Sequence, residues 1–143
     1  VTISGIWAEQ TRSMLERFEK RFESQEVFDV VLVLGGTNDV LQNVPLETTL
    51  ANLQAIHRLA SQQSMVGILG LPIFLPQIWG VEEHAASRRL ILNAKLKEQV
   101  AGYSFPSFFV DLESLSPSYL YDGLHFTNEG YQQLAFCVAE KLR

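Results

Sequence analysis

The sequence is poor in cysteine and in basic residues. Cys137 is the only cysteine of the 143 residues, which excludes an internal disulfide framework and leaves the compartment open, with a lean toward the reducing cytoplasm. The 11 Lys and Arg residues are outnumbered by 16 Asp and Glu residues, for a net charge of −5. They form no basic stripe that could neutralise a phosphate backbone, so no nucleic-acid partner is expected.

Long apolar runs and linkers are missing as well. No apolar stretch approaches the roughly 18 residues of a membrane span, and the start lacks the basic and apolar regions of a signal peptide. There is no internal repeat and no boundary rich in Pro, Gly or Ser. Because a chain of this length can build one core but hardly two, residues 1–143 are expected to form a single domain.

Three short apolar runs predict strands. They are residues 28–34 (FDVVLVL), which end at Gly35 and Gly36, residues 66–71 (VGILGL), which stop at Pro72, and residues 107–112 (SFFVDL). Runs of this kind are typical of strands that are buried on both faces of a parallel sheet. Residues 1–3 could be the end of a further strand.

Helical periodicity fills the segments between these runs. The predicted helices contain Met14, Leu15, Phe18 and Phe22 in the first, residues 45–59 in the second, 82–100 in the third and 128–142 in the last. Pro45 suits a first helical turn, and Thr127 suits the N-cap of the last helix. The alternation of apolar runs and amphipathic helices predicts an α/β fold.

Polar residues follow the first predicted strand. Gly35-Gly36-Thr37-Asn38-Asp39 comes where ligands bind in open parallel sheets, and the Asn38 amide could donate a hydrogen bond to a developing oxyanion. Alternatively, the segment is a turn stabilised by Asn38 and Asp39. It has the spacing of neither a phosphate-binding loop nor a dinucleotide fingerprint, so no cofactor is expected.

A second polar motif follows the third predicted strand. In Asp122-Gly123-Leu124-His125, the carboxylate could accept a hydrogen bond from the His125 Nδ1–H and leave Nε2 as a general base. Alternatively, these are a loop Asp and an ordinary surface His. His57 and His84 fall within predicted helices, where structural roles are expected. Asp39, Asp122 and His125 lack the spacing of a zinc site, so no metal is expected.

Taken together and in this order, the two motifs resemble the GDSL or SGNH hydrolase family, which is named for Ser, Gly, Asn and His in separate blocks. Asn38 matches the third block, Asp122 with His125 the last, and Gly5 the second. The resemblance implies a three-layer α/β/α, flavodoxin-like fold with a parallel sheet. It also implies hydrolysis of acyl esters or thioesters, in which a Ser attacks, His125 takes its proton, Asp122 orients His125, and Gly5 and Asn38 hold the oxyanion.

The first block of that family, Gly-Asp-Ser, occurs nowhere in the sequence. An N-terminal strand and helix of the family fold are therefore expected to be missing, and in the strand order 2-1-3-4-5 the missing strand is central. Ser4 adjoins Gly5 and is expected to lie on the wrong side of the site to replace the nucleophile. The chain alone is expected to be inactive or weakly active.

Substrate and partners are less well determined by the sequence. Phe74, Ile78 and Trp79 follow a predicted strand and could line an acyl pocket, or they could only cover the core. The expected substrate is a small acyl ester. Two other functions remain open: a non-catalytic module that binds acyl groups or glycans, and an assembly component that associates, as a homo-oligomer for example, through unpaired strand edges.

Overall fold

A three-stranded parallel sheet organises the chain. The computed structural model describes residues 2–22, 27–75, 80 and 84–143. Its strands, in spatial order, are β1 (Val30–Val33), β2 (Met65–Leu69) and β3 (Ser107–Val110). Val31 lies opposite Val66, and Ile68 lies opposite Phe109. Since the strands are parallel, their carboxyl ends share one edge of the sheet, and the loops that follow them gather there.

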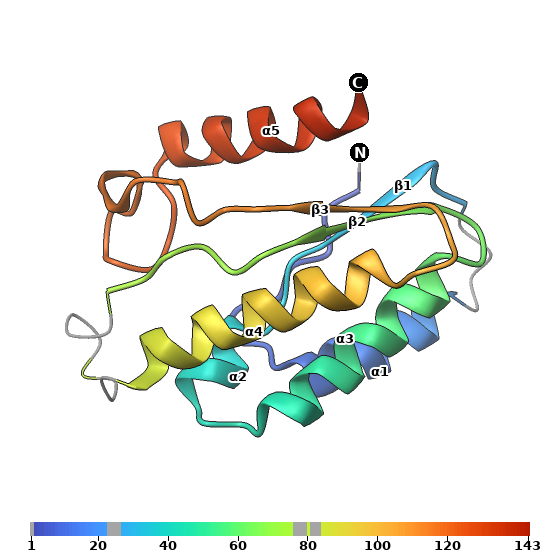
Figure 1. The fold of residues 1–143 in the computed structure, drawn as a ribbon, viewed down its shortest axis with the longest axis horizontal. Coiled ribbons are helices and arrows are strands. Elements are labelled where there is room, and N and C mark those ends of the chain that lie inside the picture. Colours follow the sequence, from blue (N-terminus) through green and yellow to red (C-terminus); the bar gives the residue numbers. More distant parts are fainter. Residues whose placement is uncertain (1, 23–26, 76–79, 81–83) are drawn as a thin grey trace.

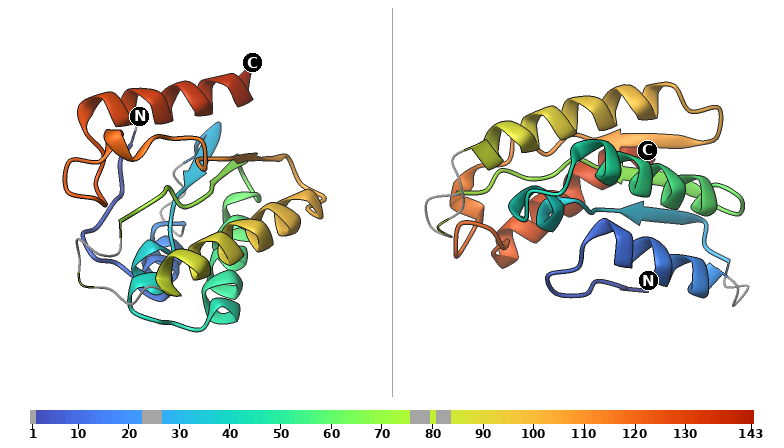
Figure 2. Two further views of the ribbon diagram at one scale, coloured as in Figure 1. Left: turned by 60° about the vertical axis from the view of Figure 1, so that its left-hand side comes forward. Right: turned by 90° about the horizontal axis from the view of Figure 1, so that it is seen from below.

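Helices cover both faces of this sheet (Figure 1, Figure 2). On one face lie α1 (Thr11–Phe22), α2 (Thr37–Leu41), α3 (Leu46–Ala60) and α4 (His84–Ala101), and on the other lies α5 (Asn128–Leu142). A short 3-10 helix, η2 (Pro117–Tyr119), interrupts the loop between β3 and α5. The predicted α/β fold with a parallel sheet between helical layers is confirmed.

The helix boundaries follow the local signals in the sequence. The helix α3 begins at Leu46, directly after Pro45, and α5 begins after Thr127, whose hydroxyl accepts a hydrogen bond from the Gly130 N–H at 3.1 Å. The helix α2 was not predicted, because its five residues lie within a motif typical of a turn. Gly36, in the left-handed region at φ 105°, makes the bend that leads into it.

The core lies mostly between the sheet and the layer that contains α3 and α4. Its fully buried members include Ile56, Leu92 and Leu96. A second apolar cluster, which includes Val110, Leu112 and Val138, joins β3 to α5. Because α5 packs on β3, the order of the strands places β1 farthest from α5.

The strand β1 is therefore only partly covered. Leu32 is 48 % exposed and the following Leu34 is 40 % exposed. The expectation that residues 28–34 are buried on both faces is wrong, because no described element covers Leu32 from the α5 side. Thr2 and Ile3 belong to no strand, and within the described ranges no strand pairs with the outer edge of β1. None of the described helices has the length and apolar character needed to cross a membrane.

Candidate active site

Asp122 and His125 form a hydrogen-bonded pair in the loop between η2 and α5. The His125 Nδ1 lies 2.6 Å from Asp122 Oδ2. The other carboxylate oxygen, Oδ1, accepts the backbone N–H groups of His125 at 2.7 Å and of Leu124 at 3.0 Å. Gly123, at φ 82°, lets the chain fold back so that one carboxylate reaches all three donors. The imidazole is thereby held through Nδ1, with Nε2 on the opposite side of the ring.

These contacts keep the Asp122 carboxylate charged. Desolvation raises the pKa of Asp122, but the hydrogen bonds from the His125 backbone, the His125 ring and the Leu124 N–H together outweigh it and lower the pKa below its ordinary value. Asp122 is therefore ionised at neutral pH. An ionised carboxylate on Nδ1 fixes one imidazole tautomer and stabilises the imidazolium when Nε2 gains a proton.

Tyr121 supports the other side of this pair. Its ring stacks on the His125 ring, with 5.9 Å between centroids and 22° between planes, and its backbone N–H donates to the His125 carbonyl at 3.0 Å. The sequence does not predict this contact, because the spacing of Tyr121 and His125 does not distinguish a stacked ring from two exposed ones.

Asn38 lies in the first turn of α2, at the carboxyl end of β1. Its Nδ2 donates to the backbone carbonyl of Glu9 at 3.0 Å. The next residue, Asp39, is 1 % exposed and accepts hydrogen bonds from the Thr11 N–H at 2.9 Å and the Thr11 hydroxyl at 2.5 Å. Asp39 thus fixes the start of α1 against α2. Sequence reasoning missed this role, because Thr11 and Asp39 lie far apart in the chain.

Gly5 lies in the segment that leads into α1. A Cβ atom added to Gly5 would meet no other heavy atom within 4 Å, so its surroundings are open in this structure. The neighbouring Ser4 hydroxyl accepts hydrogen bonds from Arg17 at 2.6 Å and from Arg21 at 3.3 Å. Among the hydrogen bonds of the described residues, Ser4 has none with an imidazole that could activate it.

The structure places Asn38 and His125 at the same edge of the sheet, since each follows the carboxyl end of a strand. The segment that carries Gly5 reaches Asn38 through Glu9. Phe74, a candidate for the acyl pocket, is 4 % exposed and belongs to the core cluster. Ile78 and Trp79 lie outside the described residues.

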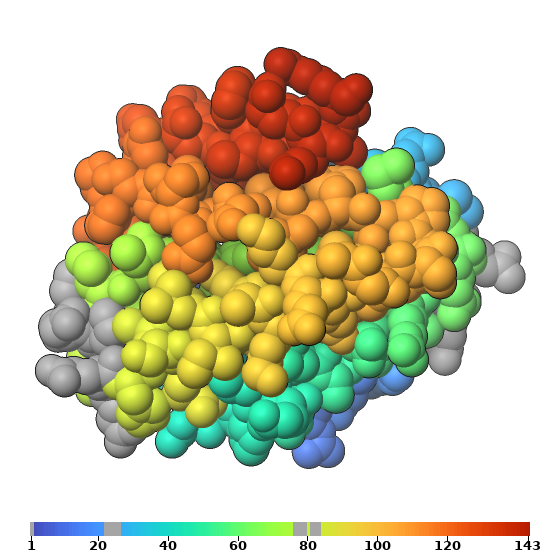
Figure 3. Space-filling model, in the orientation of Figure 1, coloured from blue at the N-terminus to red at the C-terminus, as the bar shows by residue number. Residues whose placement is uncertain are grey.

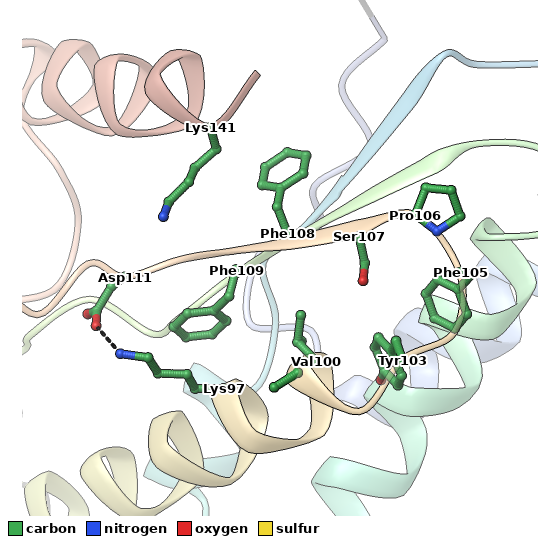
Figure 4. A pocket seen from close by; sticks show the side chains of 11 residues that line it. Lys97, Val100, Tyr103, Phe105, Pro106, Ser107, Phe108, Phe109, Asp111 and Lys141 are labelled. Carbon is green, nitrogen blue, oxygen red and sulfur yellow. Dashed lines mark hydrogen bonds and ion pairs between the residues drawn. The ribbon is translucent and has the colours of Figure 1, made fainter. Parts of the chain in front are cut away.

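Among the described residues, two of the hollows lie beside the helices, and neither of these two is lined by Asp122 or His125. An open groove of about 590 Å³ runs along β3 between α4 and α5, where Lys97 pairs with Asp111 at 3.4 Å (Figure 3, Figure 4). A smaller one of about 310 Å³ lies between α2 and the start of α4. The described residues include no cluster of three or more His, Cys, Asp or Glu side chains that could hold a metal ion.

Residues 1–133 match the model of the GDSL-like lipase/acylhydrolase family. The chain belongs to this family. The match runs from the segment that carries Gly5 into α5, so it includes the Asn38 motif and the Asp122–His125 loop. The resemblance found in the two motifs is confirmed.

Solved structures similar to this member of the GDSL-like family share its fold. A Streptococcus pneumoniae protein named for platelet activating factor has a TM-score of 0.80 at 24% identity, over 99% of this chain and 72% of the other. A carbohydrate esterase family 3 protein from Talaromyces cellulolyticus has a TM-score of 0.77 at 16% identity, over 94% and 67%. A lipase/acylhydrolase from Enterococcus faecalis has a TM-score of 0.72 at 21% identity, over 94% and 71%. No curated protein matched the chain significantly.

Proposed function

We propose that this chain carries the acid–base and oxyanion-binding part of a serine-dependent ester hydrolase. The hydrogen bond of 2.6 Å between Asp122 Oδ2 and His125 Nδ1 is the observation that carries the proposal. An imidazole that is held at Nδ1 by an ionised carboxylate can act as a general base through Nε2. Membership of an acylhydrolase family makes an ester the class of substrate that this pair would act on.

In the proposed reaction, His125 Nε2 takes the proton of a serine hydroxyl while the serine oxygen attacks the ester carbonyl. Asp122 stabilises the imidazolium, and the amide of Asn38 with the N–H of Gly5 donates to the oxyanion. The imidazolium then protonates the departing alkoxide, which leaves an acyl-enzyme. Water, deprotonated by His125, attacks this ester; the tetrahedral intermediate then releases the acid, and the serine recovers its proton.

The proposed reaction takes its nucleophile from a segment outside this sequence. No Gly-Asp-Ser occurs in the sequence, and the Ser4 hydroxyl is engaged by the arginines of α1. Loss of the nucleophile from a comparable triad costs roughly 10⁶ in turnover and leaves about 10³ to 10⁴ over the uncatalysed rate. The chain by itself is therefore expected to turn over short esters weakly or not at all.

The test compares three proteins on p-nitrophenyl acetate: this chain, its Ser4→Ala variant, and a chain extended upstream by a segment that contains Gly-Asp-Ser. We expect hydrolysis only from the extended chain, and its loss when His125 is replaced by Ala. Vigorous hydrolysis by the short chain that disappears in Ser4→Ala would make Ser4 the nucleophile. Hydrolysis that survives Ser4→Ala would overturn the assignment of a missing serine.

Small acyl esters form the proposed substrate class, and acylated carbohydrates fall within it. One structural neighbour is named a carbohydrate esterase, and its similarity of fold makes this subclass worth testing. The extended chain should release acetate from an acetylated monosaccharide if it belongs to this subclass. Tight binding of the sugar or of an acyl chain, without release of acid by either form, would favour the alternative of a binding module.

An assembly role is the second candidate, because one observation favours it. Apolar residues are exposed on β1 (Leu32), directly after it (Leu34) and on α5 (Tyr131 and Phe136). Leu32 approaches Gly67 together with Phe108, whose side chain packs in the α5 cluster, so Leu32 lies on the face of the sheet that α5 covers. A second chain that covers these side chains would bury apolar surface and could pair with the outer edge of β1.

A further inference from the structure

A charged cluster built around two buried side chains of α4 ties together two loops at the carboxyl edge of the sheet. Arg89 is 5 % exposed, and Asn93, four residues later on the same face of α4, is 7 % exposed. Arg89 makes two hydrogen bonds with the Glu113 carboxylate, one of 2.6 Å and one of 2.9 Å. Glu113 follows β3, so this pair joins α4 to the loop that leads toward Asp122. Arg89, Asn93 and Glu113 are called the α4 clamp below.

The α4 clamp also holds the backbone directly after β2. Asn93 Oδ1 accepts the Leu71 N–H at 2.7 Å, and Asn93 Nδ2 donates to the Leu71 carbonyl at 2.9 Å. Arg89 donates to the same carbonyl at 3.1 Å, and Asn93 Nδ2 reaches Glu113 at 2.6 Å. Both polar groups of the Leu71 peptide backbone are thus satisfied by side chains of α4, as they would be by a neighbouring strand.

A backbone hydrogen bond connects this loop to the Asp122–His125 pair. The Leu75 N–H donates to the Gly123 carbonyl at 2.8 Å. Gly123 lies between Asp122 and Leu124, whose N–H binds the Asp122 carboxylate. Between Leu71 and Leu75 the chain has little freedom, because it contains Pro72 and the buried Phe74. A shift of Leu71 would therefore be transmitted to the turn that presents His125.

The chemistry of the α4 clamp favours a positioning role over a purely stabilising one. Burial of the Arg89 guanidinium costs desolvation free energy, and its partner Glu113 has a side chain that is 36 % exposed, so the ion pair is a weak source of stability. What apolar side chains cannot do is bind both polar groups of the Leu71 backbone and fix their direction. Charged groups of fixed geometry are useful where the loops they hold must present other groups accurately.

We propose that Arg89, Asn93 and Glu113 are positioning residues that set the orientation of His125 through the loop of residues 71–75 and Gly123. This proposal rests on the proposed function, because the orientation of the His125 ring matters for catalysis only if His125 acts as the general base. It predicts that loss of the α4 clamp changes the His125 ring even where the fold and its stability are preserved.

The test uses the ¹⁵N shifts of the His125 ring at alkaline pH, which report the ratio of its two tautomers, and the hydrogen exchange of the Leu75 amide. We expect Arg89→Met to shift the tautomer ratio away from Nδ1–H and to speed Leu75 exchange by about tenfold or more. Arg89→Lys, which keeps the charge, should restore part of both signals. Leu96→Ala, on the same helix but within the apolar core, should leave the ratio unchanged.

The variant Arg89→Met/Glu113→Leu separates positioning from stability. It also removes the exposed carboxylate that Arg89→Met leaves without its guanidinium, so its thermal stability should be close to that of Arg89→Met while the His125 signature stays altered. A normal tautomer ratio in either variant would overturn the proposal, and if Arg89→Met does not fold, the double variant decides. The tautomer ratio and the Leu75 exchange rate are measured without substrate. Absence of hydrolysis by the extended chain would therefore overturn the proposed function but not the positioning role of the α4 clamp. In an active extended chain, Arg89→Lys should lower kcat with KM little changed.

Discussion

At the scale of single residues, Asp122 has the clearest chemical consequence. Its carboxylate accepts one ring and two backbone N–H groups, and the Asn side chain can keep the shape but not the charge. We expect Asp122→Asn to lower kcat of the extended chain by about 10⁴, because the imidazolium loses its counter-charge and the tautomer is no longer fixed. Steady-state kinetics would measure this, and a loss below about tenfold would count against the role of Asp122.

The same carboxylate gives a pH dependence of stability. Because its pKa is lower in the folded chain, its contribution is fully present above the unfolded value of about 3.9 and is lost as pH falls through the folded value. We expect the melting temperature of the chain to fall more steeply below about pH 4 than that of Asp122→Asn. If the melting temperatures of the two proteins fall equally as the pH is lowered, this prediction is contradicted.

The burial of His57 predicts a second pH dependence of stability, at higher pH than that of Asp122. It is fully buried beside the Tyr103 hydroxyl, 2.8 Å from Nδ1, and burial lowers its pKa from 6.5 to about 4. As the pH falls, the unfolded chain therefore binds a proton at His57 before the folded chain does. The contribution of neutral His57 to the free energy of unfolding is fully present above pH 6.5 and is lost as the pH falls toward 4, by about 3 kcal/mol in total. Urea unfolding of His57→Leu should lack this decline.

Tyr103→Phe is the matched control for His57. It removes the hydroxyl but keeps the imidazole buried among the same neighbours, so the decline between pH 6.5 and about 4 should persist. A flat profile in Tyr103→Phe would mean that the hydroxyl, and not burial of the ring, causes the lowered pKa of His57.

At the scale of elements, neighbouring residues of α2 have different tasks. Asp39 is buried and anchors the start of α1, so Asp39→Ala should reduce the free energy of unfolding by about 3 kcal/mol. Asn38→Ala loses one hydrogen bond to Glu9 and should cost about 1 kcal/mol. In the extended chain, however, Asn38→Ala should lower kcat by about 10² to 10³. If both variants lose stability and activity in equal proportion, Asn38 is only a structural residue.

The elements also differ in how well the sequence predicts them. The strands were found because Val-rich runs end at Gly or Pro, and α5 because Thr127 caps it. These are local signals. The helix α2 was missed because a five-residue helix has hardly any periodicity. The exposure of Leu32 depends on where α5 packs, which no pattern within β1 reveals.

The candidate site likewise has parts that the sequence predicts and parts that it does not. The Asp122–His125 pair was predictable, because three residues of separation and a glycine bring the groups together by local geometry. The α4 clamp was not, because Arg89 and Glu113 are 24 residues apart and meet only when β3 packs beside β2. The bonds of Thr11 to Asp39 are likewise products of tertiary structure.

At the scale of the whole molecule, the exposed apolar face predicts self-association. Within the described ranges nothing covers Leu32 from the α5 side or pairs with the outer edge of β1. We expect a dimer in sedimentation experiments at high protein concentration, and its weakening by Leu32→Lys, which places a charge on that surface. Leu90→Lys, at a similarly exposed apolar residue of α4 on the opposite face of the sheet, is the matched control. A strictly monomeric chain would contradict the prediction.

The arrangement of the strands in chain order has a consequence for the order of folding. Each strand pairs with the one that precedes it in the sequence, so every addition extends a sheet that already exists. During synthesis, β1 can pair with β2 across the α3 crossover before β3 has left the ribosome. Connections of this local kind shorten the loops that must close, which favours fast folding. We therefore expect the sheet to grow from β1 outward, with the loop that carries His125 ordered last.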